Sequence, residues 1–409
     1  MPNPAPEPPK EVTLSLSDPD LFRREIRAFL DRELTDRMRG APRTIMLLDV
    51  DIQQEWHRRL AAQGWAVPDW PLEHGGTGWS QEQMNIFFQE MVRAGAPPLS
   101  PNLQMIGPVL IAWGTPEQQQ RHLPPLRSGE IVWCQGFSEP GAGSDLASLR
   151  LKAVRDGDDY VLNGQKIWTS YAHASDWMFA LVRTSTEGKP QAGISFLLID
   201  MATPGIVVRP IRSIDGLHHL NEVFFNDVRV PVGNRVGAEN DGWSVAKYLL
   251  QHERNGVAGD VYLRMRLAKI RAIAEALPDD EGGGTIAADP VYARRFRKVE
   301  VELLALEALI ASADAATDPE FKQQISSVLK LRGSEIEQAI AELGRIAMGS
   351  LAWLDQSHTL EHPDEPVVGP AGVPEAMLSY LLGRAASIYG GSSEIQRGII
   401  FKQLRQYGV

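Results

Sequence analysis

The sequence contains one cysteine in 409 residues, Cys134. A single cysteine excludes a disulfide within the chain and is typical of proteins from reducing compartments. Cys134 ends an apolar run at 131–134 and has no histidine close to it in sequence, which favours a small packed side chain over a nucleophile. Long apolar runs are missing as well, since none approaches the roughly 20 residues that a membrane helix needs. We therefore expect neither a disulfide nor a membrane span.

The sequence also has no excess of basic residues. Lys and Arg number 41 against 52 Asp and Glu, which gives a formal net charge of −11. Nucleic-acid-binding surfaces need a basic stripe, so we expect no nucleic-acid partner. The balance still allows a local basic pocket for a phosphate-bearing ligand. With 43% hydrophobic and 23% charged residues, the composition is that of an ordinary globular protein of two or three packed units.

The first residues are rich in proline and contain neither an apolar signal core nor an amphipathic helix rich in Arg and Ser. We interpret residues 1–17 as a flexible tail on a cytoplasmic protein.

Residues 18–130 carry a helical pattern. The apolar residues from Phe22 to Leu34 recur at helical spacing and fall on one helix face. Asp18 and Pro19 supply a cap and a first turn for this helix. Further helices are predicted at 52–62, 81–94 and 116–126, so this first third of the chain is expected to be all-α.

Residues 131–240 change to short runs of β-forming residues separated by turns. A turn is predicted at 156–158, and Asn163-Gly164 is interpreted as a hairpin turn that leads into Trp168. The spacing predicts a compact β-barrel or sandwich. The expected strands are 161–162, 167–169, 177–183, 193–199, 205–208 and 222–230.

Residues 241–409 return to a helical pattern. One long helix is predicted at 245–277 in spite of Gly256 and Gly259. Three consecutive glycines within 279–285 indicate a flexible connection. The order of helices, strands and helices predicts an α+β fold class. The other helices of this part are expected at 290–315, 319–348 and 374–388.

Several common catalytic patterns are not found in the sequence. Gly141-Ala142-Gly143 lacks the third glycine of a dinucleotide-binding turn, and no phosphate loop with a GK[ST] ending occurs. His358 and His362 have metal-ligand spacing but no third ligand, so we interpret them as surface histidines and expect no metal site. No Ser-His-Asp set stands out.

Three segments do carry patterns with chemical meaning. Residues 138–145 offer small residues with backbone N–H groups that can donate to a planar ligand, although the same residues would also form an ordinary surface turn. Residues 163–170 end in Trp168 and Ser170. Residues 388–397 form a glycine turn that opens a helix, whose N-terminus can hold an anion or a polar ring edge.

In this order and separation, the three segments resemble those of the acyl-CoA dehydrogenase family, and the resemblance covers about residues 20–400. It implies an N-terminal helical domain at 18–130, a middle β-barrel domain at 131–240 and a C-terminal four-helix bundle at 241–409. It also implies FAD, held between the last two domains. The residues that the resemblance places at the flavin, at its adenine end or at the CoA entrance are Gln135, Phe137, Ser138, Gly143, Ser144, Trp168, Ser170, Ser392 and Glu394.

The family's catalytic base is where the sequence departs from the common pattern. In many members a glutamate follows a tyrosine in the C-terminal glycine turn, but here Tyr389 is followed by Gly390. Isovaleryl-type and long-chain-type members place the glutamate on a helix at the start of the C-terminal domain, where Glu253 matches. An apolar pocket would raise the pKa of this carboxyl toward the working pH. The alternative is a carboxylate on the helix surface, paired with Arg254 or with a residue one turn away.

Gly390 has no side chain to act as a base, but its backbone N–H group remains available for catalysis. Its backbone N–H could donate to the thioester carbonyl as negative charge develops there. The resemblance therefore implies catalytic roles for Glu253 and Gly390, and substrate contacts from Ser144, Arg254 and Tyr389.

A second departure concerns assembly. In many relatives an Arg followed by Phe-Gly, and a later glycine pair, reach from one subunit to the FAD pyrophosphate of its neighbour. This chain has Arg294, Arg295 and Arg297 without Phe-Gly, and the later site reads Met348-Gly349-Ser350. Such losses occur in bacterial branches in which two different subunits share one flavin site. We expect a homotetramer or a heterotetramer with a sister subunit.

The activity implied by the resemblance is the FAD-dependent α,β-dehydrogenation of an acyl-CoA thioester, with electrons passed to an electron-transfer flavoprotein. Two alternatives stay open. In the first alternative, the chain is a non-catalytic or co-catalytic subunit of a heteromeric acyl-CoA dehydrogenase. In the second, it is a flavin oxidase or monooxygenase that uses oxygen on the same fold. The sequence leaves the acyl group open, because pocket shape decides it.

Overall fold

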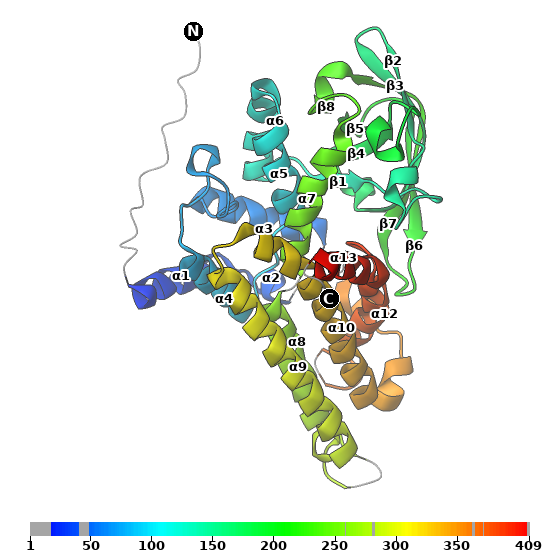
Figure 1. The fold of residues 1–409 in the computed structure, drawn as a ribbon. Coiled ribbons are helices and arrows are strands. Elements are labelled where there is room, and N and C mark those ends of the chain that lie inside the picture. The colour runs from blue at the N-terminus through cyan, green and yellow to red at the C-terminus, as the bar shows by residue number, and fades with distance from the viewer. Residues whose placement is uncertain are drawn as a thin grey trace.

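The computed structural model describes residues 18–40, 49–257, 259–279, 283–361, 365–370 and 372–406. The tail expected at 1–17 lies outside these residues. Helices, then strands, then helices follow one another along the chain (Figure 1). The α+β fold class is thereby confirmed. Along the chain, a helical N-terminal part precedes the middle sheet and a helical C-terminal part follows it. Within the described ranges, no helix has both the length and the apolarity to cross a membrane.

The N-terminal part is helical, as predicted. Asp18 caps its first helix, because the carboxylate accepts from the backbone N–H groups of Asp20 and Leu21. The predicted helix at 81–94 is confirmed with the same bounds, and Ser80 caps it. The helices of this part are α1 (Pro19–Glu33), α2 (Asp36–Gly40), α3 (Val50–Gln63), α4 (Gln81–Ala94), α5 (Pro101–Trp113) and α6 (Pro116–Ser128).

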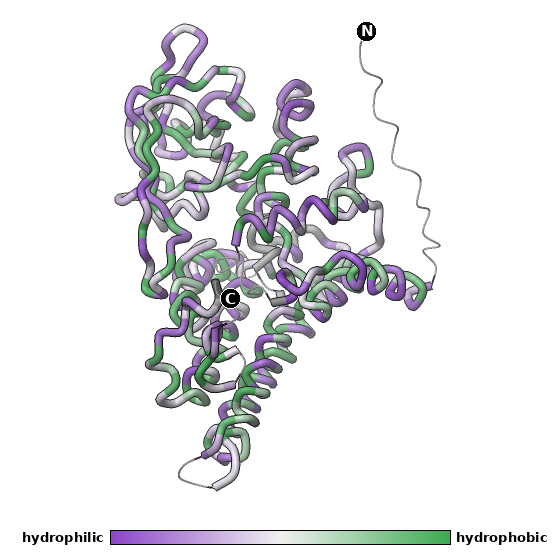
Figure 2. Tube along the Cα trace, turned by 180° about the vertical axis from the view of Figure 1, so that it is seen from behind, coloured by the Kyte–Doolittle hydropathy of each residue, from purple (hydrophilic) through white to green (hydrophobic). Residues whose placement is uncertain are grey.

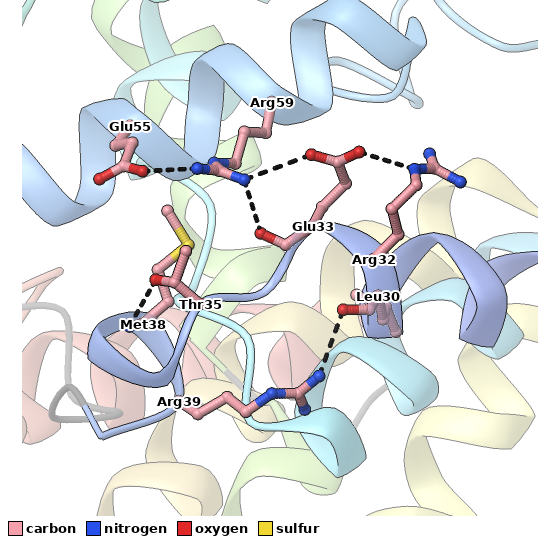
Figure 3. A network of polar contacts seen from close by, with 8 residues as sticks. All are labelled: Leu30, Arg32, Glu33, Thr35, Met38, Arg39, Glu55 and Arg59. Atoms are coloured by element: carbon pink, nitrogen blue, oxygen red, sulfur yellow. Dashed lines mark hydrogen bonds and ion pairs between the residues drawn. The ribbon is translucent and has the colours of Figure 1, made fainter.

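Apolar packing and a few ion pairs hold α1, α3 and α4 together. Phe22, Ile26 and Leu30 of α1 are buried in a shared core. Figure 3 shows the polar contact at its edge, where Arg59 on α3 donates to the Glu33 carbonyl at 2.9 Å. Arg59 also donates to the Glu55 carboxylate at 2.8 Å. Exposed ion pairs of this kind add at most about 1 kcal/mol each, so the buried apolar residues dominate.

The middle part is a single eight-stranded sheet. Its strand order is β6-β7-β3-β2-β4-β5-β8, and β1 pairs in parallel with β4. Strand β4 matches the prediction, and Cys134 of β1 is buried, as expected for a packed side chain. Burial raises the pKa of the Cys134 thiol to about 12. The strands are β1 (Trp133–Gly136), β2 (Lys152–Asp156), β3 (Asp159–Ser170), β4 (Trp177–Arg183), β5 (Ile194–Asp200), β6 (Ile206–Arg212), β7 (His218–Pro231) and β8 (Arg235–Val236).

The hairpin turn predicted at Asn163-Gly164 is wrong. Both residues lie inside the long strand β3, where the pairing with β7 shifts register between Leu162 and Gly164. Gly164 takes a φ of 144°, which glycine tolerates, so the strand accommodates the irregularity as a bulge and continues. The β2–β3 hairpin turn lies at Gly157 instead, since Asp156 pairs with Asp159.

The C-terminal part is helical, and two of its helices have the predicted bounds. The single helix predicted at 245–277 is wrong, because α7 ends at Val257 and α8 begins at Asp260 with Gly259 as its N-cap. Glycine is costly in a helix interior, and here it marks the boundary. The helices are α7 (Gly242–Val257), α8 (Asp260–Ala276), α9 (Pro290–Ala315), α10 (Pro319–Met348), α11 (His358–Glu361), α12 (Val373–Leu382) and α13 (Ser393–Gln406).

The segment predicted as a helix at 374–388 is divided as well. Helix α12 ends at Leu382, and the 3-10 helix Gly383–Ser387 follows it. Helix α10 lies at the centre of this part and contacts α7, α8, α9, α12 and α13. Figure 2 shows hydrophobic and hydrophilic residues alternating along these helices, which is the pattern of helices that bury one face.

One apolar core connects all three parts of the chain. It contains Val109 of α5, Phe196 of β5, and Val245 and Leu249 of α7. Helix α7 comes close to the sheet because it starts at Gly242, where a Cβ atom would collide with the Ser195 backbone. The core therefore fixes α7 relative to the β sheet.

Candidate functional site

The loop after β1, residues 137–145, is a tight turn with an open outer side. Glu139 and Ala142 exchange two backbone hydrogen bonds of 3.1 and 2.9 Å, and Phe137 packs into the core. Gly141 and Gly143 face open space, because a Cβ atom on either would meet nothing within 4 Å. A planar ligand can therefore approach the backbone here.

Strand β3 lies directly against this loop. The backbone N–H of Ile167 donates to the Ser138 carbonyl at 3.0 Å. The Lys166 ammonium donates to the Phe137 carbonyl at 3.0 Å and to the Glu139 carboxylate at 2.8 Å. The structure therefore brings the first two sequence motifs into contact.

Trp168 projects from a second irregularity of β3. The pairing of β3 with β7 shifts register between Lys166 and Thr169, and Trp168 has a φ of 60°. Positive φ is uncommon for a residue as bulky as tryptophan, and such backbone is often found at functional sites. The Trp168 side chain is 57% exposed, and Ser170 at the end of the strand is half-buried. This exposed ring beside an open glycine loop fits a planar cofactor.

The C-terminal glycine turn is rigidly held. Gly390 and Gly391 have φ values of 64° and 87°, and the buried Gln396 donates to both of their carbonyls at 3.1 and 3.3 Å. Ser392 is buried at the start of α13, and its hydroxyl accepts from the Ile395 N–H at 3.4 Å. Glu394 is exposed in the first turn of α13, and the backbone N–H groups there hold its pKa below the usual range.

Tyr389 precedes this turn and is 42% exposed. Burial around its hydroxyl raises the pKa of Tyr389, and the nearby Glu337 carboxylate adds to the rise. Glu337 is itself paired with Arg266 at 2.8 Å. The third motif is thus held against α10 of the bundle, while the first two lie together on the sheet.

Glu253 and Arg254 both lie on α7. The side chains of residues 251–257 are outside the described part of the structure, so the role of Glu253 as base stays a prediction. Its helix and the glycine turn are nevertheless linked, because α7 and α13 both contact α10.

The remaining predicted site residues lie as follows. Gln135 is half-buried on β1, and Ser144 is exposed on the loop. Arg294, Arg295 and Arg297 are exposed on α9. His358 is an exposed histidine that lies 3.3 Å from the Glu365 carboxylate, and His362 is outside the described residues.

Sequence reasoning missed Lys166 and Glu139, although a signal was present. Tyr160, Leu162 and Lys166 of β3 are buried at every second position, apart from the exposed Gly164 between them. A lysine at an inward position of a strand requires an acidic partner. Glu139 lies within the loop motif itself and was therefore available as the predicted partner of Lys166.

Comparisons with known proteins agree with this geometry. Models of the acyl-CoA dehydrogenase N-terminal, middle and C-terminal domains match residues 17–130, 134–228 and 240–405. Acyl-CoA dehydrogenase IpdE1 of Mycobacterium tuberculosis is 37% identical over 373 residues, which cover 86% of this chain and 87% of the relative.

Two solved structures are similar over nearly the whole chain. The ChsE4–ChsE5 complex from Mycobacterium tuberculosis matches with a TM-score of 0.75 and 31% identity, covering 93% of this chain and 95% of the matched chain. The Tcur3481–Tcur3483 steroid acyl-CoA dehydrogenase matches with a TM-score of 0.78 and 29% identity, covering 93% and 95%. Because the three domain models span most of the chain in the order seen in the fold, the protein belongs to the acyl-CoA dehydrogenase family of oxidoreductases.

Proposed function

We propose that the chain catalyses the FAD-dependent α,β-dehydrogenation of an acyl-CoA thioester to the trans-2-enoyl-CoA. In this proposal the electrons pass to an electron-transfer flavoprotein in the cytoplasm. The observation that carries it is the contact between the two β-domain motifs, in which the Ile167 N–H donates to the Ser138 carbonyl at 3.0 Å. This contact sets the open loop at Gly141–Gly143 beside the exposed Trp168.

The residues of the site fit FAD. The backbone at Gly141 and Gly143 is accessible, Trp168 offers an exposed aromatic face, and α13 presents a helix N-terminus for polar or anionic groups. When bound, FAD would supply the acceptor for the hydride that leaves the β-carbon. The residues proposed to hold it are Gln135, Phe137, Ser138, Gly143, Ser144, Trp168, Ser170, Ser392 and Glu394.

The proton chemistry falls to the chain's own residues. We assign removal of the α-proton to the Glu253 carboxylate, which an apolar acyl pocket would make a stronger base. The Gly390 N–H would donate to the thioester carbonyl as charge develops on it. Ser144, Arg254 and Tyr389 are proposed to contact the substrate.

A second candidate function is that of a subunit that completes a flavin site together with a sister chain. Three observations favour this candidate function. Gly390 cannot act as a base, and apolar side chains around the glycine turn and along α13 are exposed, with 67% for Ile388 and 60% for Phe401. Both solved neighbours are named as pairs of different chains. We therefore propose a tetramer and favour the heterotetramer.

A ring-bearing acyl group is the substrate class that we propose to test first. One structural neighbour is named a steroid enzyme and is 29% identical to this chain. A panel of CoA thioesters with linear, branched and polycyclic acyl groups, scored by bleaching of the flavin, would distinguish these classes. Bleaching by linear acyl-CoA alone would exclude the ring-bearing class.

The deciding experiment for the reaction is Glu253→Gln, with Glu275→Gln on the exposed side of α8 as the matched control. Both variants are expected to bind FAD. Only Glu253→Gln should lose substrate-dependent bleaching, by about a thousandfold in rate, because a general base contributes in that range. Unchanged bleaching would remove Glu253 from the mechanism.

The same preparations test the other two candidates. Expression of the chain alone and together with a sister subunit shows whether FAD is retained only in the complex, which would favour the shared-site function. Rapid reoxidation of the substrate-reduced protein by air, without an electron-transfer flavoprotein, would favour the oxidase.

A further inference from the structure

Lys166 is a charged residue with a fully buried side chain on β3. Its Nζ donates to Glu139 Oε1 at 2.8 Å and to the Phe137 carbonyl at 3.0 Å. Burial lowers the pKa of Lys166 to about 8, while the charge of Glu139 opposes that fall. A charge this deep is retained only when it is paired and hydrogen-bonded. The two side chains therefore act as one unit.

Glu139 extends this unit to a third segment of the chain. Its side chain is 8% exposed, and its carboxylate accepts from the backbone N–H groups of Arg150 at 2.6 Å and Leu151 at 2.8 Å. Both carboxylate oxygens therefore have protein donors. The loop after β1, strand β3 and the segment at 150–151 all meet at this one carboxylate.

The ion pair lies where the two cofactor segments join. The residue after Lys166 is Ile167, whose N–H donates to the Ser138 carbonyl at 3.0 Å. Directly beyond it, β3 leaves its register with β7 and Trp168 takes a positive φ. Three consecutive loop residues are thus tied to two consecutive strand residues immediately before Trp168.

We propose that Lys166 and Glu139 are positioning residues of the cofactor site. Their ion pair holds the open loop at 138–145 and the segment 168–170 in the relative position that FAD binding requires. This inference rests on the proposed function. Because Lys166 is fully buried, it acts through the Phe137 carbonyl and Glu139, and it does not itself reach the open side of the loop.

A positioning role can be separated from a contribution to folding alone. Replacing both members of a buried ion pair by neutral groups often leaves stability nearly unchanged, whereas removing one member leaves an unpaired charge. Lys166→Met/Glu139→Gln removes both charges and keeps an amide oxygen that can accept from Arg150 or Leu151. The loop then loses its tie at the Phe137 carbonyl while the core stays filled.

The test measures FAD affinity, the visible spectrum of the bound flavin and its reduction potential in wild type and in this double variant. We expect the dissociation constant for FAD to rise about tenfold or more. Losses of this size are common when residues that orient the ligand-binding groups through hydrogen bonds are removed. The spectrum and the potential at saturating FAD should shift as well. A purely structural role would lower the melting temperature and leave spectrum and potential unchanged.

The matched control is Arg27→Met/Glu90→Gln in the N-terminal part. Glu90 is also buried, at 3% exposed, and pairs with Arg27 at 2.7 Å and with Arg23 at 2.8 Å, but on helices away from the sheet. Because the control leaves Arg23 without its carboxylate partner, it should lower stability, but it should not change FAD affinity. If the double variant does not fold, Glu139→Asp alone is measured, because it keeps both charges and shortens only the side chain that ties the loop to β3. A shift in spectrum and potential is again expected.

The outcomes distinguish this inference from the proposed function. Failure of the wild type, alone and with a sister subunit, to take up FAD would overturn the proposed function. Uptake by the wild type, with affinity, spectrum and potential unchanged in the folded Lys166 or Glu139 variants, would overturn the positioning role. An equal loss of affinity in the Arg27 control would overturn it as well.

Discussion

The side chain of Asn221 on β7 is fully buried and donates from Nδ2 to the Thr169 carbonyl on β3 at 3.0 Å. The same amide lies between two histidines, with Nδ2 at 3.2 Å from His173 Nδ1 and Oδ1 at 2.8 Å from His218 Nε2. An amide nitrogen only donates, so His173 Nδ1 accepts and His218 Nε2 carries the proton. One buried amide therefore fixes the backbone between Trp168 and Ser170.

Asn221→Ala should destabilise the chain by about 1–3 kcal/mol, because the Thr169 carbonyl loses a buried donor. The free energy of unfolding in urea measures this. Asn163→Ala is the matched control, since the Asn163 side chain pairs with Asp227 at 2.9 Å on the exposed side of the same two strands. The control should lose about 0.5 kcal/mol. Equal losses in both variants would show that the Asn221 amide has no special role.

The fold was predictable where helix ends carry strong signals. Helix α9 starts at Pro290 and α10 at Pro319 as predicted, because proline in the first turn marks a helix start. The boundary between α7 and α8 was missed, since apolar spacing continues across Gly256 and Gly259 and only the packed structure shows the interruption. Local pattern alone also could not show that Gly164 sits in a bulge and not in a turn.

The candidate site was predictable as motifs but not as contacts. Alternation along β3 places Lys166 inward, yet its partner Glu139 lies 27 residues earlier in the chain. Pairing over that separation depends on how the loop folds back on the strand, which no local spacing encodes. The hypothesis of a base at Glu253 rests on the family resemblance.

His122 makes the stability of the chain sensitive to acid. Its ring on α6 packs edge-on against Trp133 and Trp177, with centroids 5.3 and 4.7 Å apart. Burial lowers the pKa of His122 from 6.5 to about 4, and the charge of Arg121 adds to the effect. Between these values the unfolded chain binds a proton that the folded chain does not, so stability is lost as the pH falls through this window.

From pH 7 to pH 5, the His122 contribution should cost about 2 kcal/mol of unfolding free energy. His122→Phe keeps an aromatic ring and should remove that part of the pH dependence. Leu72→Phe is the control, because it adds a phenyl ring at a 69% exposed position and changes no titratable group. The pH dependence of this control should match that of the wild type. The measurement is urea unfolding at both pH values. Identical pH dependence in wild type and His122→Phe would contradict the prediction.

Gly391 is constrained both by its backbone and by its neighbour. Its φ is +87°, and a Cβ atom would lie 2.6 Å from Nε2 of the buried Gln396. Gly391→Ala should therefore cost about 2 kcal/mol, from left-handed strain and from the weakened hydrogen bonds of Gln396. Gly188→Ala isolates the strain, because Gly188 has a φ of +72° with nothing within 4 Å. The control should lower the free energy of unfolding by about 1 kcal/mol. Equal losses of stability in the two variants would mean that the Gln396 side chain moves aside without a cost.

Gly242 determines how closely α7 approaches the sheet. A Cβ atom at this position would collide with the backbone of Ser195 and Phe196 on β5, which cannot rotate away as a side chain can. Gly242→Ala should push α7 outward, disturb the fully buried Val245 and Leu249, and destabilise the chain by about 3 kcal/mol.

Gly233→Ala is the matched control, since a Cβ atom there meets nothing within 4 Å, and it should change stability by no more than about 0.5 kcal/mol. Helix α7 also carries Glu253. Substrate should therefore bleach the flavin bound to the Gly242 variant more slowly than the flavin bound to the wild type, even where the variant remains folded. Wild-type stability for Gly242→Ala would contradict the close contact of α7 with β5. Wild-type bleaching in a destabilised variant would instead show that the base does not depend on the position of this helix end.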